Sequence, residues 1–251
     1  MGKPPGVLAL HGLTGSTHSV EGVAAALAAA GVAVRAPMLP GHGTVVDDLD
    51  AMRWADWLGA AETEFAELAA TCDSLVLFGL SMGGSLACAL AAEHPGDVAG
   101  LVLVNPFIDP PAESFREAVR SAIAGGFPRA PGIAGDVADP SVTERGYDQL
   151  PLEALLSLCE GLDGLLPRLP DVTCPALLMS SRTDHVVPTE SSDLLAGRIG
   201  GPVERVWLDR SWHVATLDYD RDEIERRTIE FVAKEAGVFR FRPGSRRPTY
   251  L

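Results

Sequence analysis

The segment Gly79-Leu-Ser81-Met-Gly83 carries the clearest chemical signal in this sequence. An apolar run at 75–78 predicts a buried strand before it, and an Ala-rich stretch predicts a helix directly after it. A serine in this strand–turn–helix context is typical of a nucleophile elbow, in which a sharp turn lifts the hydroxyl above the sheet. Glycines are expected at 79 and 83 because neighbouring backbone approaches such a turn closely. We therefore predict that Ser81 is a nucleophile rather than a bystander in a packing turn.

A nucleophilic serine needs a base, and His213 is the best placed of the six histidines. It lies between the last predicted strand, 203–208, and the last predicted helix. In a doubly wound sheet, such a loop opens at the carboxyl ends of the strands, where Ser81 also emerges. His185 remains a weaker alternative as the base. His11 and His42 are expected to be structural, and His94 is expected to lie at a helix end. His18 carries no clear signal.

The base in turn needs an acid that orients the imidazole and stabilises its charged form. Asp184 follows the predicted strand 176–180, so it should reach the same edge of the sheet. The order Ser81, Asp184, His213 is the order in which α/β-hydrolases carry their triad. Three other carboxylates follow the last strand: Asp209, which is the runner-up, and Asp218 and Asp220, which are expected in the first turn of the final helix.

An oxyanion hole requires two backbone N–H groups aimed at the developing negative charge. One should come from Met82, directly after the nucleophile. The other should come from the glycine-containing loop His11-Gly-Leu-Thr-Gly-Ser16, and Leu13 is the expected donor. Taken alone, this loop would be read as a turn without a ligand, but it too follows a predicted strand.

Strand-like and helix-like segments alternate along the chain. Short apolar runs that read as strands buried on both faces occur at 7–10, 32–35, 75–78, 101–104, 176–180 and 203–208. Amphipathic or Ala-rich segments between them predict helices at 20–30, 54–68, 82–94 and 219–236. This alternation predicts an α/β fold with a mostly parallel sheet of about six or more strands, flanked by helices on both faces.

The alternation stops between 105 and 175, where no convincing strand is present and the clearest helix carries Leu152, Leu155, Leu156 and Leu158. A stretch this long is not expected to be a structureless loop in a compact domain. We predict a core formed by 1–104 and 176–238, a short helical cap at 105–175, and a basic C-terminal tail at 239–251.

The composition narrows the range of partners. The chain has 251 residues, 47% of them hydrophobic and 22% charged, which excludes a disordered or fibrous protein. Its net charge of −14 disfavours nucleic acid and anionic lipid as partners. The four cysteines have no metal or redox spacing, and no apolar run is long enough for a secretory signal or a membrane span. We expect a cytoplasmic monomer or weak homodimer that needs no cofactor and no metal.

Five segments together resemble a known family: His11-Gly-Leu-Thr-Gly-Ser16, Leu39-Pro-Gly-His-Gly43, Gly79-Leu-Ser-Met-Gly-Gly84, Asp184-His-Val-Val-Pro188 and His213-Val-Ala-Thr-Leu-Asp218. They resemble the small bacterial carboxylesterases of the α/β-hydrolase superfamily and the similar monoacylglycerol lipases. The resemblance implies a helical cap and hydrolysis of short- to medium-chain esters, including monoacylglycerols. The chain is expected to depart from the family in two ways: it should lack the first two strands of the full superfamily sheet, and Leu13 stands where relatives often carry an aromatic residue.

Several functions remain open within this interpretation. Acyl-thioesterases, lactonases and other hydrolases share the serine triad, so the motifs do not separate them from esterases. Dehalogenases and epoxide hydrolases of this fold carry aspartate at the elbow and are excluded by Ser81. A catalytically inactive small-molecule binding protein is the alternative from a different class. Such proteins typically lose a triad residue, whereas all three candidates are present here.

Overall fold

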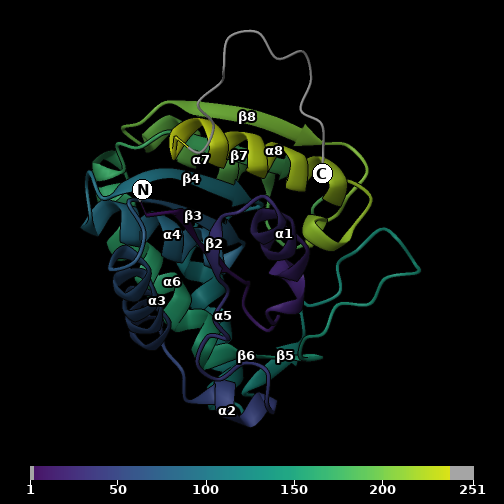
Figure 1. The fold of residues 1–251 in the computed structure, drawn as a ribbon. Coiled ribbons are helices and arrows are strands. Elements are labelled where there is room, and N and C mark those ends of the chain that lie inside the picture. Colours follow the sequence, from purple (N-terminus) through teal and green to yellow (C-terminus); the bar gives the residue numbers. More distant parts are fainter. Residues whose placement is uncertain (1–2, 238–251) are drawn as a thin grey trace, which may run out of the picture.

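The computed structural model describes residues 3–237, and its centre is a six-stranded sheet in which every strand pair is parallel. The order is β2-β1-β3-β4-β7-β8 (Figure 1). The strands are β1 (Pro5–Leu10), β2 (Ala33–Arg35), β3 (Ser74–Leu80), β4 (Val98–Val104), β7 (Ala176–Ser181) and β8 (Val203–Leu208). The predicted α/β fold is confirmed, and all six predicted strands are present. The predicted tail, 239–251, lies outside the described residues.

Helices cover both faces of the sheet. On one face, α1 (His18–Ala29) packs beside α8 (Arg221–Glu235), as Figure 1 shows. The other face is covered by α3 (Trp54–Ala69), α4 (Met82–Glu93) and α7 (Thr189–Arg198), and α6 (Leu152–Leu165) packs against α3 and α4. Among the described residues, no helix combines the length and apolar character needed to cross a bilayer.

Successive strand residues point to opposite faces, and both sets are buried. In β1, Leu8 and Leu10 belong to the core beneath α3 and α4, whereas Val7 and Ala9 belong to the core beneath α1 and α8. All four side chains are fully buried. This double burial explains why the strands appear in the sequence as continuous apolar runs rather than as alternating ones.

The segment between β4 and β7 corrects one expectation, because it contains two short strands. β5 (Arg129–Pro131) and β6 (Gln149–Pro151) form an antiparallel ribbon. Strands of three residues are too short to show a hydrophobic period, and their pairing depends on a partner some twenty residues away. The segment also contains α5 (Glu113–Ala124) and the 3₁₀ helix η1 (Leu166–Asp171).

Ion pairs and a small apolar cluster hold this segment together and connect it to the core. Val119 of α5 packs against Leu152 and Leu156 of α6. The Arg116 guanidinium donates two hydrogen bonds to the Asp163 carboxylate. At the other end of the segment, the β5 residue Arg129 pairs with two carboxylates of the short helix α2 (Val46–Asp50).

Candidate active site

Ser81 lies in a turn that only glycine neighbours permit. The residue joins β3 to α4 with φ 54° and ψ −119°. A Cβ on Gly79 would lie 2.4 Å from the Gly83 carbonyl carbon, and a Cβ on Gly83 would lie 2.1 Å from the Leu10 carbonyl oxygen. Contacts under 3 Å are not compatible with a side chain. The close backbone approach expected at both glycines is therefore present, and it presents Ser81 at the carboxyl edge of the sheet.

Backbone strain is concentrated at this edge. Within residues 3–237, the non-glycine residues with positive φ are Thr14, Ser81 and Asn105. They lie after β1, β3 and β4, respectively, which are neighbours in the sheet. Such conformations cost about 1–3 kcal/mol each and persist where the surrounding structure enforces them, often at functional sites.

The loop after β1 passes directly beside Ser81. A Cβ on Gly12 would lie 3.3 Å from the Ser81 Cβ, so the glycine allows this approach. Within the described residues, neither the Leu13 amide nor the Met82 amide donates a hydrogen bond to the protein. Both N–H groups thus remain available as donors beside the hydroxyl, as an oxyanion hole requires.

His213 and Asp184 form a buried pair. The His213 Nδ1 lies 2.8 Å from the Asp184 Oδ2, and the two side chains are 5% and 3% exposed. The Asp184 Oδ1 accepts hydrogen bonds from the Val186 and Val187 amides, both at 2.8 Å. These donors fix the carboxylate, which in turn orients the imidazole and can stabilise its protonated form.

Ser81 and His213 line the same small pocket, together with Glu144. Within residues 3–237, the Ser81 Oγ makes no hydrogen bond to the imidazole. Catalytic hydrogen bonds of this kind are often long until substrate binds. The structure thus brings the three predicted side chains to one place, with the Asp184–His213 contact formed and the Ser81–His213 contact open.

The weaker candidates are occupied elsewhere. His185 is about half exposed, and its Nδ1 lies 2.8 Å from the Asp136 Oδ1. Asp209 is largely exposed and accepts a hydrogen bond from Arg182 at 2.7 Å. Within residues 3–237, neither side chain makes a hydrogen bond to the His213 ring or to Ser81.

The expected location of Asp218 is wrong, because α8 begins only at Arg221, whereas Asp220 lies directly before the first turn of this helix. Asp218 is fully buried and accepts hydrogen bonds from four backbone amides, including those of Ala138 and Trp212. Asp220 is the N-cap residue and pairs with Arg210. Asp218 therefore connects loops to each other, whereas the charge of Asp220 lies at the N-terminus of α8, where it offsets the helix dipole.

His11 and His42 are buried structural histidines, as expected. Burial lowers the pKa of His11 to about 3 and that of His42 to about 4, with the neighbouring histidine contributing to the first shift. The His11 Nε2 accepts a hydrogen bond from the Leu39 amide at 3.1 Å, and its Nδ1 lies 2.9 Å from the Gly12 carbonyl oxygen. The neutral ring thus holds the loop that carries Leu13.

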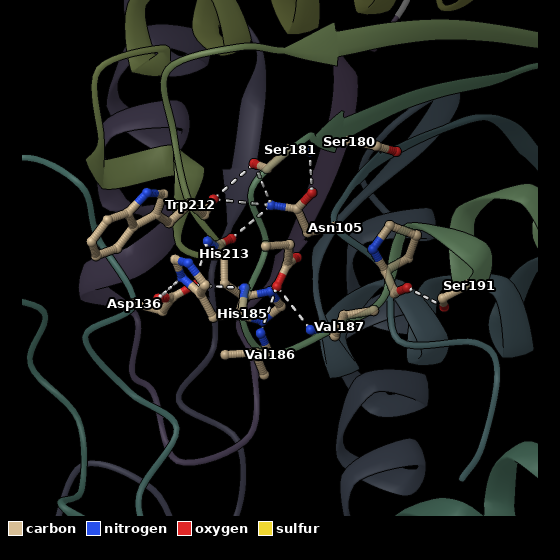
Figure 2. Close-up of polar contacts among 12 residues, drawn as sticks. Asn105, Asp136, Ser180, Ser181, His185, Val186, Val187, Ser191, Trp212 and His213 are labelled. Atoms are coloured by element: carbon tan, nitrogen blue, oxygen red, sulfur yellow. Dashed lines mark hydrogen bonds and ion pairs between the residues drawn. The ribbon is translucent and has the colours of Figure 1, made fainter. Parts of the chain in front are cut away.

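Asn105 is a site residue that sequence reasoning missed. Its side-chain amide donates to the His213 carbonyl oxygen at 2.8 Å and to the Ser181 Oγ at 2.9 Å, and its Oδ1 accepts from the Ser181 amide at 2.7 Å (Figure 2). Asn105 therefore connects β4, β7 and the loop of His213. The sequence feature that could have identified Asn105 as a site residue is its position directly after a predicted strand.

Glu144 was also missed, because it lies in a loop without a motif. Burial raises the pKa of its carboxyl group, although the Gly135 amide donates a hydrogen bond to it at 2.7 Å. It is the acidic side chain that lines the small pocket with Ser81 and His213.

A larger apolar cavity of about 190 Å³ also opens beside Ser81. Leu13, Val186 and Val187 line it from the core, and Phe107, Phe115, Ile133, Leu150, Leu155 and Leu158 line it from the segment between β4 and β7. By contrast, Leu152 and Leu156 pack against α5. The leucines of this segment therefore divide between a cavity wall and internal packing.

Comparison with known proteins identifies the family. The model of the family described as serine aminopeptidase, S33, matches residues 5–220. The thermostable monoacylglycerol lipase of Bacillus sp. (strain H-257) is 39% identical over 238 residues, which cover 93% of this chain and 92% of that protein. The carboxylesterase of Bacillus subtilis (strain 168) is 25% identical over 236 residues, with 93% and 94% coverage.

Solved structures agree with this result. A structure described for LipS and LipT, two metagenome-derived lipolytic enzymes, matches with a TM-score of 0.86 and 35% identity over 93% of this chain and 95% of that chain. The monoacylglycerol lipase of Paleococcus ferrophilus shares the fold, with a TM-score of 0.72 and 19% identity over 94% and 97% of the two chains. The chain therefore belongs to the serine aminopeptidase S33 family of α/β-hydrolases, within the group of small carboxylesterases and monoacylglycerol lipases.

Proposed function

We propose that this protein is a serine carboxylesterase that hydrolyses short- to medium-chain carboxylic esters through an acyl-enzyme on Ser81. The observation that carries this proposal is the buried Asp184–His213 pair, whose histidine lines a pocket together with a serine held in a strained elbow. An activated nucleophile requires this combination of serine, base and orienting acid.

The residues act in the following order. The Ser81 Oγ attacks the ester carbonyl while the His213 Nε2 takes its proton, and the Leu13 and Met82 amides stabilise the resulting oxyanion. His213 returns the proton to the leaving alkoxide, so that the alcohol departs and the acyl group remains on Ser81. A water molecule, deprotonated by His213, then attacks this ester and releases the carboxylic acid. Asp184 stays ionised throughout.

We also propose that the segment 105–175 is a cap whose apolar wall binds the acyl chain. The support is the large cavity, which Leu150, Leu155 and Leu158 line together with Ser81. Each methylene that an acyl chain buries contributes about 0.8 kcal/mol, so kcat/KM should rise by up to about fourfold per carbon until the cavity is full.

Monoacylglycerol is the substrate we propose within this class. The relative with 39% identity is a monoacylglycerol lipase, and the small pocket beside Ser81 contains one carboxylate, that of Glu144. A carboxylate there can accept hydrogen bonds from the free hydroxyls of a glycerol group. Glu144→Ala should therefore reduce kcat/KM for a monoacylglycerol more than for the methyl ester of the same acid. An equal reduction for both esters would argue against a role in recognising glycerol.

The nucleophile can be tested by substitution. Ser81→Ala should lower kcat by about 10⁴- to 10⁶-fold while the fold is retained, as triad deletions do elsewhere. Ser180→Ala is a matched control, because Ser180 is also a buried serine at a strand end and, within residues 3–237, its hydroxyl makes a hydrogen bond only to Ser192. Retention of a tenth of the wild-type activity by Ser81→Ala would show that another group is the nucleophile.

We further propose that the enzyme is a monomer or weak homodimer that acts in the cytoplasm without a cofactor, and that its substrate is a small molecule rather than a nucleic acid. The support is the net charge of −14 and the four cysteines, which are all unpaired. Light scattering across a concentration series would measure the oligomeric state directly.

A further inference from the structure

Asp136 connects the segment between β4 and β7 to the loops of both His213 and His185. It lies in the connection between β5 and β6, and its side chain is 13% exposed. Its Oδ2 accepts hydrogen bonds from the His213 amide at 3.0 Å and from the His185 amide at 3.2 Å. Its Oδ1 lies 2.8 Å from the His185 Nδ1, as Figure 2 shows.

Further hydrogen bonds join the loop of Asp136 to the loop of His213 around this carboxylate. The Val214 amide donates to the Asp136 carbonyl oxygen at 3.0 Å. The Ala138 and Asp139 amides donate to the Asp218 carboxylate at 2.7 and 3.1 Å. The segment 136–139 is therefore attached to the segment 212–218 by both backbone and side-chain hydrogen bonds.

These contacts add a third restraint on His213, which two other residues also hold. Asn105 binds the His213 carbonyl oxygen and Asp184 binds the ring, whereas Asp136 binds the backbone N–H. A ring nitrogen must lie within hydrogen-bond reach of the serine hydroxyl to act as its base. Fixing both peptide groups of His213 restricts the backbone movements that would carry its side chain away from Ser81, while Asp184 holds the ring itself.

Asp136 also acts on the loop of the acid. The residue that follows Asp184 is His185, and Asp136 binds both its amide and its ring. One carboxylate from outside the sheet thus joins the loop after β7 to the loop after β8. No motif marks Asp136 in the sequence, because its partners lie 49 and 77 residues away.

We propose that Asp136 is a positioning residue that aligns the Asp184–His213 pair on Ser81 and couples this alignment to the closed position of the segment 105–175. The proposal rests on the function proposed above. Asp136 does not touch the reacting atoms; it acts through the backbone of His213. Displacement of the segment 105–175 would remove this hydrogen bond and loosen the base, so the enzyme would be fully assembled only when the segment is closed over the site.

Two variants of Asp136 separate this role from general stabilisation. Asp136→Ala removes the acceptor and should lower kcat about 10- to 100-fold on p-nitrophenyl butyrate, since misplacing a catalytic group by about 1 Å has an effect of this size. KM should change by less than about threefold, because the substrate pocket is untouched. Asp136→Asn keeps an oxygen that both backbone amides can reach, so it should retain kcat within about threefold.

His185→Ala is the matched control. It removes the ring contact of Asp136 but leaves both backbone amides bound, so kcat should stay within about threefold of the wild-type value. All assays belong at a temperature well below the measured Tm of each variant. The proposal would be overturned if Asp136→Ala kept more than half of the wild-type kcat, or if either Asp136→Asn or His185→Ala lost as much as Asp136→Ala.

Hydrogen exchange gives a second readout that does not require activity. Peptides covering 211–217 should exchange at least about tenfold faster in Asp136→Ala than in the wild type, and Asp136→Asn should restore protection, because the His213 N–H loses or keeps its acceptor. Unchanged protection in Asp136→Ala would refute the positioning role whatever the enzyme hydrolyses. A wild-type protein without esterase activity but with this exchange pattern would refute the proposed function and leave the positioning of His213 supported.

Discussion

Acid should destabilise this protein through His11 and His42. The two rings lie 4.8 Å apart between their centroids, and both are almost fully buried. Burial lowers the pKa of His11 to about 3 and that of His42 to about 4, against about 6.5 for an exposed histidine. The folded state therefore keeps both rings neutral at a pH where the unfolded chain protonates them.

The sign and size of the effect follow from this difference in bound protons. Well above a pH of about 6.5, both histidines are neutral in the folded and in the unfolded state, and no stability is lost. As the pH falls below this value, the unfolded state protonates its histidines first. The free energy of unfolding therefore decreases as the pH falls towards the pKa values of the folded state. At pH 5, each histidine should have lowered the free energy of unfolding by about 2 kcal/mol, and the pair by about 4 kcal/mol. This is a large share of the 5–15 kcal/mol that stabilises a typical domain.

Urea unfolding at several pH values, followed by tryptophan fluorescence, measures this loss. His42→Gln removes one titrating ring but keeps a donor for the Pro40 carbonyl oxygen, which the His42 Nδ1 approaches at 3.1 Å. Between pH 6 and pH 5, the wild type should lose about 1.2 kcal/mol more than this variant. Both proteins have the same carboxylates, so the contribution of these groups cancels in the comparison. Equal losses in the two proteins would refute the reasoning.

Three further predictions concern the elbow, the base and the cavity. In urea unfolding, Gly83→Ala should destabilise the fold by at least about 1–3 kcal/mol, because the new Cβ would meet the Leu10 carbonyl oxygen. Gly59→Ala is the control and should stabilise the fold by about 0.5–1 kcal/mol, because Gly59 lies at an exposed helical position with open space around it. His213→Ala should abolish esterase activity at every pH from 6 to 9. If His213→Ala stayed active, the base would have to be assigned to His185 instead. Leu158→Trp should shorten the preferred acyl chain in a series from acetate to decanoate esters while leaving acetate hydrolysis unchanged, and an unaltered chain-length profile would remove Leu158 from the acyl site.

The fold was predictable because its strands are buried on both faces. The double burial of β1 and its neighbours produces apolar runs that need no knowledge of tertiary contacts to recognise. The short ribbon of β5 and β6 shows the opposite case, since each three-residue strand depends on its partner. The start of α8 was misplaced for a similar reason: Asp218 is used by a distant loop rather than by the helix.

The residues of the candidate site divide in the same way. Ser81, Asp184 and His213 each follow a predicted strand, so the topology of a parallel sheet was enough to place them at one edge. Asn105 and Asp136 were not found, because the groups that they bind lie 49 or more residues away and most of them are backbone amides and carbonyls. Hydrogen bonds to backbone carry no residue-type signal at the partner position, and only the folded chain reveals them.

Covalent trapping tests the central claim most directly. Incubation of the protein with a fluorophosphonate, followed by intact and peptide mass spectrometry, should show one label per chain, located on the peptide that contains Ser81. His213→Ala should react at least about 10³-fold more slowly, because the hydroxyl then lacks its base. A label on another residue, or equal labelling of the wild type and His213→Ala, would contradict the account.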